Sequence, residues 1–186
     1  EQSGHIADVG FDLYVRLVGE AVAEFRGESE EDRFGAREVK LELPIEAHLP
    51  HEYVPSERLR LEMYKRLADV RALGDVDELR AELVDRYGEP PAVVEMLLDV
   101  ARLRVKVRGA GLSEITAAGP NVRFASIDLP DSAQARLSRI YPRSTYKAAA
   151  EVVLVPRPKT AVVGGKPIDG RELLDWTSQV VDTLVA

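Results

Sequence analysis

The sequence contains no cysteine, which excludes a disulfide framework and thiol chemistry. This absence suits a reducing compartment, and we expect the protein to be cytoplasmic. Basic residues are also in short supply, because 25 lysines and arginines against 32 acidic residues give a net charge of −7. Such a balance argues against a general nucleic-acid-binding protein. No apolar run approaches the length that spans a bilayer, so we expect no membrane partner.

What is present is the composition of a folded chain. Hydrophobic residues make up 45% and charged residues 31% of 186 residues, enough for one domain with a sizeable core plus an appendage. The sequence begins at Glu1 rather than at methionine, and we expect it to be a segment of a longer protein. Residues 1–8 predict an extended connector and residues 9–25 a helix, whereas the charged residues 26–37 predict a flexible boundary.

Apolar spacing in the remainder predicts segregated helices and strands. Helices are predicted over residues 56–72, from Asp75 or Asp77 to Tyr87, from Pro91 to about Gly109, over 131–141 and over 168–186, with Ser56 capping the first. Strands are predicted over residues 38–43, 114–118, 122–129 and 146–155. We therefore expect the α+β class, with a helical cluster packed with a small mixed or antiparallel sheet and closed by the C-terminal helix.

The sequence contains no motif typical of an enzyme active site. Residues 164–166 (GGK) lack the spacing of a phosphate-binding loop, and Pro167 stands where Ser or Thr is required. His48 and His51 lie on either side of Pro50, which breaks the helical geometry that a two-histidine zinc site needs. Neither a carboxylate pair nor a Ser/His/Asp arrangement has local support. We expect no catalytic residue, no metal site and no cofactor in this chain.

Four basic residues, Arg102, Arg104, Lys106 and Arg108, follow one another at the end of the third predicted helix. Positive charge at this end complements the helix dipole, which is sufficient reason for it. A nucleic-acid contact is the alternative, although no aromatic residues are interleaved as stacking platforms. We keep this contact as the alternative function of the chain.

Residues 79–88 (LRAELVDRYG) carry apolar side chains at i, i+4, i+5 and i+8, which predicts one buried helix face. The opposite face carries Glu82, Asp85 and Arg86, which we call the charged ridge. In one interpretation Glu82 and Arg86 form a solvated i, i+4 pair that stabilises the helix by a few tenths of a kcal/mol. In the other, the charged ridge docks on a partner of opposite charge.

Four segments of the chain form a recognisable set: EQSGHIADVGFDLY, ERLRLEMYKRLADV, AELVDRYGEPP and LLDVARLR. They resemble the carboxy-terminal part of the bacterial transcription-repair coupling factor (Mfd) family. The resemblance keeps the same order from Glu1 to about Gly111, and beyond Leu112 it depends on the order of elements. The resemblance implies an ATP-driven DNA translocase that removes stalled RNA polymerase and recruits UvrA for nucleotide excision repair.

The resemblance also implies a division of this chain. Residues 1–34 would be the hook and connecting helix at the tail of the motor, and residues 35–186 a regulatory domain that binds neither ATP nor Mg²⁺. In the family this domain packs on the amino-terminal UvrB-like module and masks its UvrA-binding surface. The family's contact pattern, Glu-x-x-Asp-Arg, falls on Glu82, Asp85 and Arg86. We therefore expect a non-catalytic autoinhibitory module, which meets RNA polymerase and DNA only through the parent protein.

Overall fold

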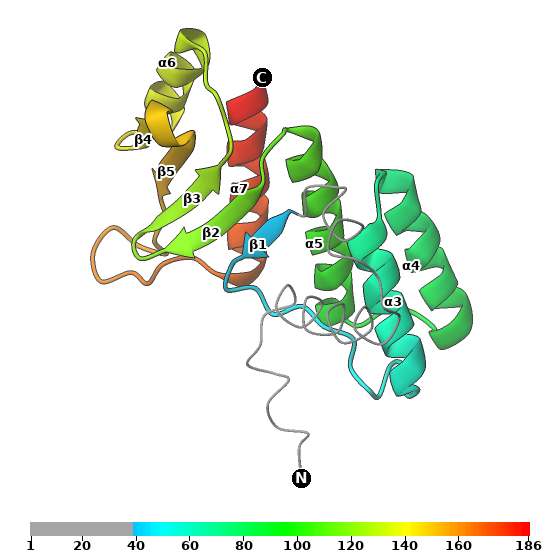
Figure 1. Ribbon diagram of the computed structural model, residues 1–186. Coiled ribbons are helices and arrows are strands. Elements are labelled where there is room, and N and C mark those ends of the chain that lie inside the picture. The colour runs from blue at the N-terminus through cyan, green and yellow to red at the C-terminus, as the bar shows by residue number, and fades with distance from the viewer. Residues whose placement is uncertain (1–38) are drawn as a thin grey trace. The chain divides into compact units, whose positions relative to one another are not determined.

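The computed structural model describes residues 39–186, so the predictions for residues 1–34 and for the boundary at 26–37 lie outside the described residues. The described chain forms two compact units (Figure 1). We call residues 46–105 the helical unit, and residues 39–45 with 106–186 the sheet unit.

The helices and strands are these, in chain order: β1 (Lys40–Glu42), α3 (Glu57–Asp69), α4 (Leu73–Tyr87), α5 (Ala92–Gly109), β2 (Glu114–Ala118), β3 (Asn121–Ala125), α6 (Asp131–Ile140), β4 (Thr145–Lys147), the 3₁₀ turn η2 (Ala148–Ala150), β5 (Val152–Pro156) and α7 (Gly170–Val185). The boundary between the units falls within α5, whose residues from Lys106 onward belong to the sheet unit.

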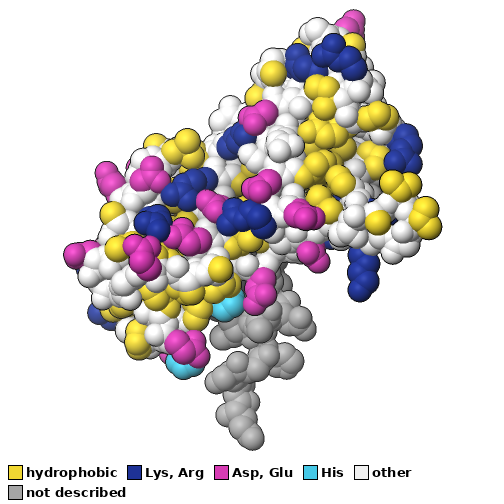
Figure 2. All heavy atoms as spheres, turned by 180° about the vertical axis from the view of Figure 1, so that it is seen from behind, with side chains coloured by type: hydrophobic (Ala, Val, Ile, Leu, Met, Phe, Trp, Pro, Cys, Tyr) yellow, Lys and Arg dark blue, Asp and Glu magenta, His cyan; other side chains and the backbone are white. Residues whose placement is uncertain are grey.

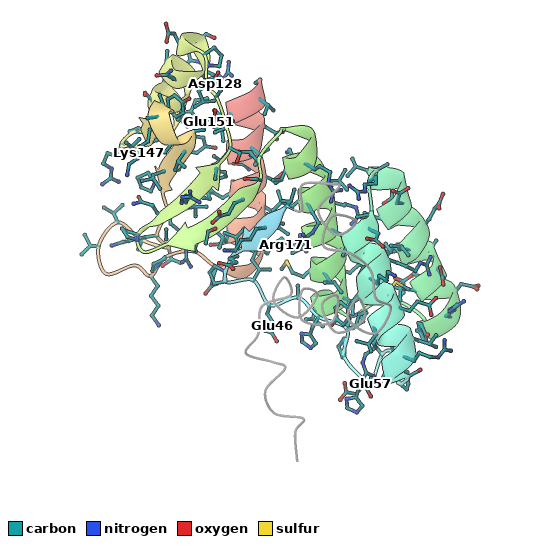
Figure 3. All side chains as sticks on the ribbon, in the orientation of Figure 1. Glu46, Glu57, Asp128, Lys147, Glu151 and Arg171 are labelled. Atoms are coloured by element: carbon teal, nitrogen blue, oxygen red, sulfur yellow. The ribbon has the colours of Figure 1, made fainter. Side chains whose placement is uncertain are left out.

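The helical unit is built from the three consecutive helices that the apolar spacing predicted. Ser56 caps α3 as predicted, because its Oγ accepts a hydrogen bond from the Leu59 N–H at 3.4 Å. Glu57, labelled in Figure 3, adds a negative charge to the first turn, where the helix dipole favours it. The apolar stripes of α3, α4 and α5 bury one another, and the fully enclosed side chains are Leu67, Val76, Leu83, Val94, Leu97, Leu98 and Ala101.

The start of α4 differs from the prediction that Asp75 or Asp77 caps it. The N-cap is Ala72, and Asp75 lies three residues further on. Its Oδ2 accepts hydrogen bonds from the Arg71 and Ala72 N–H groups, both at 2.9 Å, and these bonds lower the pKa of Asp75. Asp75 is thus the third residue of the helix, and its carboxylate accepts from the N–H groups of the N-cap residue and the residue before it. The bond to the N-cap N–H is the one that the acidic residue makes in a capping box.

The end of α4 follows the prediction. Gly88 has φ of 83°, which favours glycine, and its N–H donates to the Val84 carbonyl at 2.9 Å. The Tyr53 hydroxyl donates to the Gly88 carbonyl at 2.8 Å, and its ring lies 5.7 Å from the ring of Tyr87. The last turn of α4, which carries part of the charged ridge, is therefore held in a defined position within the helical unit.

The sheet unit contains one five-stranded sheet in the order β1-β2-β3-β5-β4. Only the β1–β2 pairing is parallel among these strands, so the sheet is mixed, as predicted. Ile115, Phe124 and Val153 are neighbours across β2, β3 and β5, and all three are completely buried. Helix α7 lies along the sheet and closes the chain (Figure 1). The α+β class is confirmed.

One predicted strand is in fact two. Residues 146–155 contain the end of β4, the turn η2 and most of β5, and Glu151 between them has φ of 51° (labelled in Figure 3). This left-handed residue turns the chain so that β4 and β5 pair antiparallel with each other. Among residues 39–186, no helix is long and apolar enough to cross a bilayer.

Candidate functional site

The charged ridge lies on the surface of the helical unit. Asp85 and Arg86 are exposed and Glu82 is partly exposed, whereas Leu79 and Leu83 on the opposite side of α4 are buried. The apolar face therefore fixes the helix to the core, and the charged face remains accessible to a partner. Figure 2 shows acidic and basic side chains intermixed over the surface of this unit.

The carboxylate of Glu82 is held by two arginines. Arg66, from α3, places Nη2 2.7 Å from Glu82 Oε2, and Arg86 places Nη2 3.4 Å from Oε1. The side chains of Arg66, Glu82 and Arg86 are 42%, 26% and 53% exposed. The i, i+4 pair expected within α4 thus exists, but the shorter contact comes from a neighbouring helix.

These contacts fix the charge state of Glu82. The hydrogen bond from Arg66 lowers the pKa of Glu82, and it raises the pKa of Arg66 in return. Glu82 therefore stays ionised to a lower pH than an unpaired glutamate would. Within the described part of the chain, Asp85 has no hydrogen-bond or ion-pair partner, so its carboxylate is free to accept from a donor outside this domain.

Other charges on α4 are paired with the following helix. Arg80 lies 2.6 Å from Glu95 and 3.1 Å from Glu89, and Asp77 lies 2.7 Å from Arg102. These pairs connect α4 to α5 and to the loop before it. They neutralise the charges along one side of α4 inside the unit, in contrast to Asp85.

The basic residues at the end of α5 are occupied within the fold. Arg102 contacts Asp99 at 2.8 Å in addition to its contact with α4, and Arg104 is only 3% exposed. Lys106 Nζ lies 2.6 Å from Asp182 of α7. Arg108 is half-buried. The side chains that would reach a phosphate backbone are thus largely committed to internal contacts.

The other two candidate sites, the histidines beside Pro50 and residues 164–166, lack the neighbouring groups that a metal site or a phosphate-binding loop needs in the described structure. His51 contacts the adjacent Glu52 at 2.9 Å, and across residues 39–186 there is no group of three His, Cys, Asp or Glu side chains that could hold a metal ion. Residues 164–166 lie in a loop closed by a bridge between Lys159 and Pro167, with no helix following directly.

Comparison with known proteins identifies the family of this chain. The sequence model of the TRCF domain matches residues 43–137, which include the whole helical unit and the charged ridge. The chain belongs to the TRCF domain family. The resemblance inferred from the sequence is confirmed, and the family match extends about 25 residues past Gly111, into α6.

Curated relatives are transcription-repair-coupling factors. That of Mycobacterium tuberculosis is 43% identical over 193 residues, covering 99% of this chain and 16% of the relative. That of Staphylococcus epidermidis is 38% identical over 124 residues, covering 67% of this chain and 10% of the relative. The crystal structure of the C-terminal domain of a transcription-repair coupling factor shares the fold, with a TM-score of 0.62, 19% identity, and coverage of 79% of this chain and 91% of that chain.

The chain thus spans about one sixth of the length of its mycobacterial relative. Arg66 is the residue of the surface that sequence reasoning missed. Its position in the last turn of α3 was visible in the sequence, but which residue of α4 it meets depends on how the two helices pack.

Proposed function

We propose that this chain is the non-catalytic, autoinhibitory module of an ATP-dependent DNA translocase that couples transcription to nucleotide excision repair. In this proposal the charged ridge docks on the amino-terminal UvrB-like module of the same protein. Docking covers the surface that UvrA would bind. ATP and Mg²⁺ are bound by the motor domains, and RNA polymerase and DNA are met by the parent protein, in the cytoplasm.

The observation that carries the proposal is the exposure of the charged ridge. Asp85 and Arg86 lie at the surface beside a partly exposed Glu82. These are the positions to which the sequence resemblance assigns the contact pattern Glu-x-x-Asp-Arg. An exposed arginine and an exposed carboxylate that are adjacent in sequence complement a partner that presents a carboxylate and a cation. Burial of any of the three in the core of the unit would have removed this support.

A charged surface of this kind suits reversible docking. Interfaces between domains of one chain commonly bury about 600–1,500 Å² and are rather polar. Covalent linkage raises the effective concentration of the partner to about the millimolar range, so weak contacts suffice to keep the domains together. A coupling of about 1–3 kcal/mol between docking and UvrA binding would regulate the protein without locking it.

The test is to mix the complete 186-residue chain with the separately produced amino-terminal module. We expect a complex in which backbone amides of α4 become protected from hydrogen exchange and which UvrA dissociates. Reversing the charged ridge (Glu82→Lys, Asp85→Lys, Arg86→Glu) should abolish the complex while the helical circular dichroism is retained. The matched control reverses another exposed i, i+4 pair, Arg171 and Asp175 of α7, and should bind normally.

The same reversal in the parent translocase should raise UvrA binding and basal ATP turnover. If the folded triple variant bound the module as the unaltered chain does, the proposal would be wrong. The nucleic-acid alternative has no comparable support, because Arg102 and Lys106 are paired and Arg104 is buried. A salt titration of duplex binding would detect such a contact, since phosphate contacts give a steep salt dependence.

A further inference from the structure

Arg66 lies outside the Glu-x-x-Asp-Arg pattern, yet it makes a shorter contact with Glu82 than Arg86 does. The two distances are 2.7 Å to Oε2 and 3.4 Å to Oε1. Two guanidinium groups from two different helices therefore meet at the two oxygens of one carboxylate. This places Arg66 next to the charged ridge in space, although 16 residues separate it from Glu82 in the chain.

One carboxylate does not neutralise two guanidinium groups. Charges of +1, −1 and +1 leave the trio of Arg66, Glu82 and Arg86 with one net positive charge. Glu62 also acts on Arg66 electrostatically, but its carboxylate is paired with Arg58. Each guanidinium has five N–H donors in a planar fork, and Arg66 uses Nη2 for Glu82. With 42% and 53% of the two arginine side chains exposed, donors remain for an acceptor that comes from outside.

We infer that Arg66 is a further docking residue outside the charged ridge, and that Arg66 and Arg86 together bind an acidic side chain of the partner while Asp85 binds a basic one. The inference rests on the proposed function and specifies the chemistry of the partner surface. Glu82 in this arrangement is a positioning residue, since its two oxygens hold the two guanidinium groups at the spacing that a carboxylate can bridge.

The experiment measures the affinity of the complete chain for the amino-terminal UvrB-like module. Arg66→Ala should weaken binding about tenfold, which corresponds to about 1.4 kcal/mol. Arg58→Ala is the matched control, because Arg58 is an exposed arginine of the same helix whose contact is with Glu62 rather than with the charged ridge. The control should change the affinity by less than about twofold.

A second variant separates docking from a merely structural role. Combining Arg66→Glu with Glu82→Arg restores an ion pair between α3 and α4 but exchanges the positions of its charges. If Arg66 served only to hold the two helices together, this double variant would regain stability and would bind more tightly than Glu82→Arg alone, which carries the same change in the charged ridge. A docking role predicts that stability returns while the affinity falls about tenfold below that of Glu82→Arg alone.

The outcomes distinguish this inference from the proposed function. Weakening by Arg66→Ala that the exchanged pair does not rescue supports the inference. Unchanged affinity of Arg66→Ala, or an exchanged pair that binds more tightly than Glu82→Arg alone, overturns the role of Arg66; if Asp85→Lys still weakens the complex, the proposed function stands. Should Asp85→Lys also have no effect, or no complex form with the unaltered chain, the proposed function falls together with the inference.

Discussion

The contact between Arg66 and Glu82 leads to a quantitative prediction for the isolated chain. The pair is joined by a hydrogen bond of 2.7 Å, but its side chains are 42% and 26% exposed, so water and salt screen it. Exposed ion pairs couple by about 0.2–1 kcal/mol, and a short bond to a largely shielded carboxylate belongs at the upper end. We predict a coupling energy of about 0.5–1 kcal/mol at neutral pH.

The coupling is measured with a double-mutant cycle of Arg66→Ala and Glu82→Ala. Urea unfolding followed by far-ultraviolet circular dichroism gives the free energy of unfolding for the chain, both single variants and the double variant. Arg58 and Glu62 provide a matched cycle on α3, where the atoms are 3.9 Å apart and both side chains are mostly exposed. We expect less than about 0.3 kcal/mol there, because the distance is long and the order of charges is the less favourable one.

The pH dependence supplies an independent check. Because Arg66 lowers the pKa of Glu82, the folded chain holds this carboxylate ionised at a pH where the unfolded chain, with an ordinary pKa of about 4.3, has protonated it. The stabilisation is therefore complete above pH about 4.3 and is lost as the pH falls through the lowered folded pKa. Two results would refute the reasoning: additive single variants at neutral pH, or a coupling that persists after Glu82 is protonated.

Three further variants can be tested with the same unfolding measurements. The Tyr64 hydroxyl accepts the buried Leu49 N–H at 2.6 Å, so Tyr64→Phe should cost about 1–3 kcal/mol and speed exchange of that amide. Tyr53→Phe removes a hydroxyl whose acceptor is exposed to water, and it should cost less than about 1 kcal/mol; equal losses in the two variants would contradict this argument. Asp85→Asn should raise the free energy of unfolding by about 0.3 kcal/mol, because it removes a negative charge from the last turn of α4, and it should weaken the docked complex. A lower free energy of unfolding would contradict the argument that a carboxylate is unfavourable at this helix end.

The helices were predictable because their signals are local. Apolar side chains at helical spacing, Ser56 before α3 and Gly88 after α4 act within a few residues of one another, and the structure has them where the sequence placed them. The outward direction of Glu82 followed from the same periodicity. What lies on one helix, and on which face of it, is therefore accessible from the sequence alone.

The details that the sequence did not give depend on tertiary structure or on single dihedral angles. The approach of Arg66 to Glu82 requires the packing of α3 on α4, which no spacing within either helix encodes. The division of residues 146–155 into two strands depends on the left-handed conformation of Glu151, which is uncommon for a residue other than glycine. The start of α4 was misplaced because Asp75 suits both a cap and the third position of a helix.

Asp85 is the residue of the charged ridge whose position least suits a purely structural role. It lies in the last turn of α4, where the partial negative charge of the helix end makes a carboxylate unfavourable by a few tenths of a kcal/mol. Asp77 and Arg80, earlier on the helix, are offset by partners on α5, but no described residue offsets Asp85. A face that served only solubility would gain from a neutral or basic residue here. A cation from a second domain reverses the disadvantage, so the residue that slightly weakens the isolated domain would strengthen the docked one.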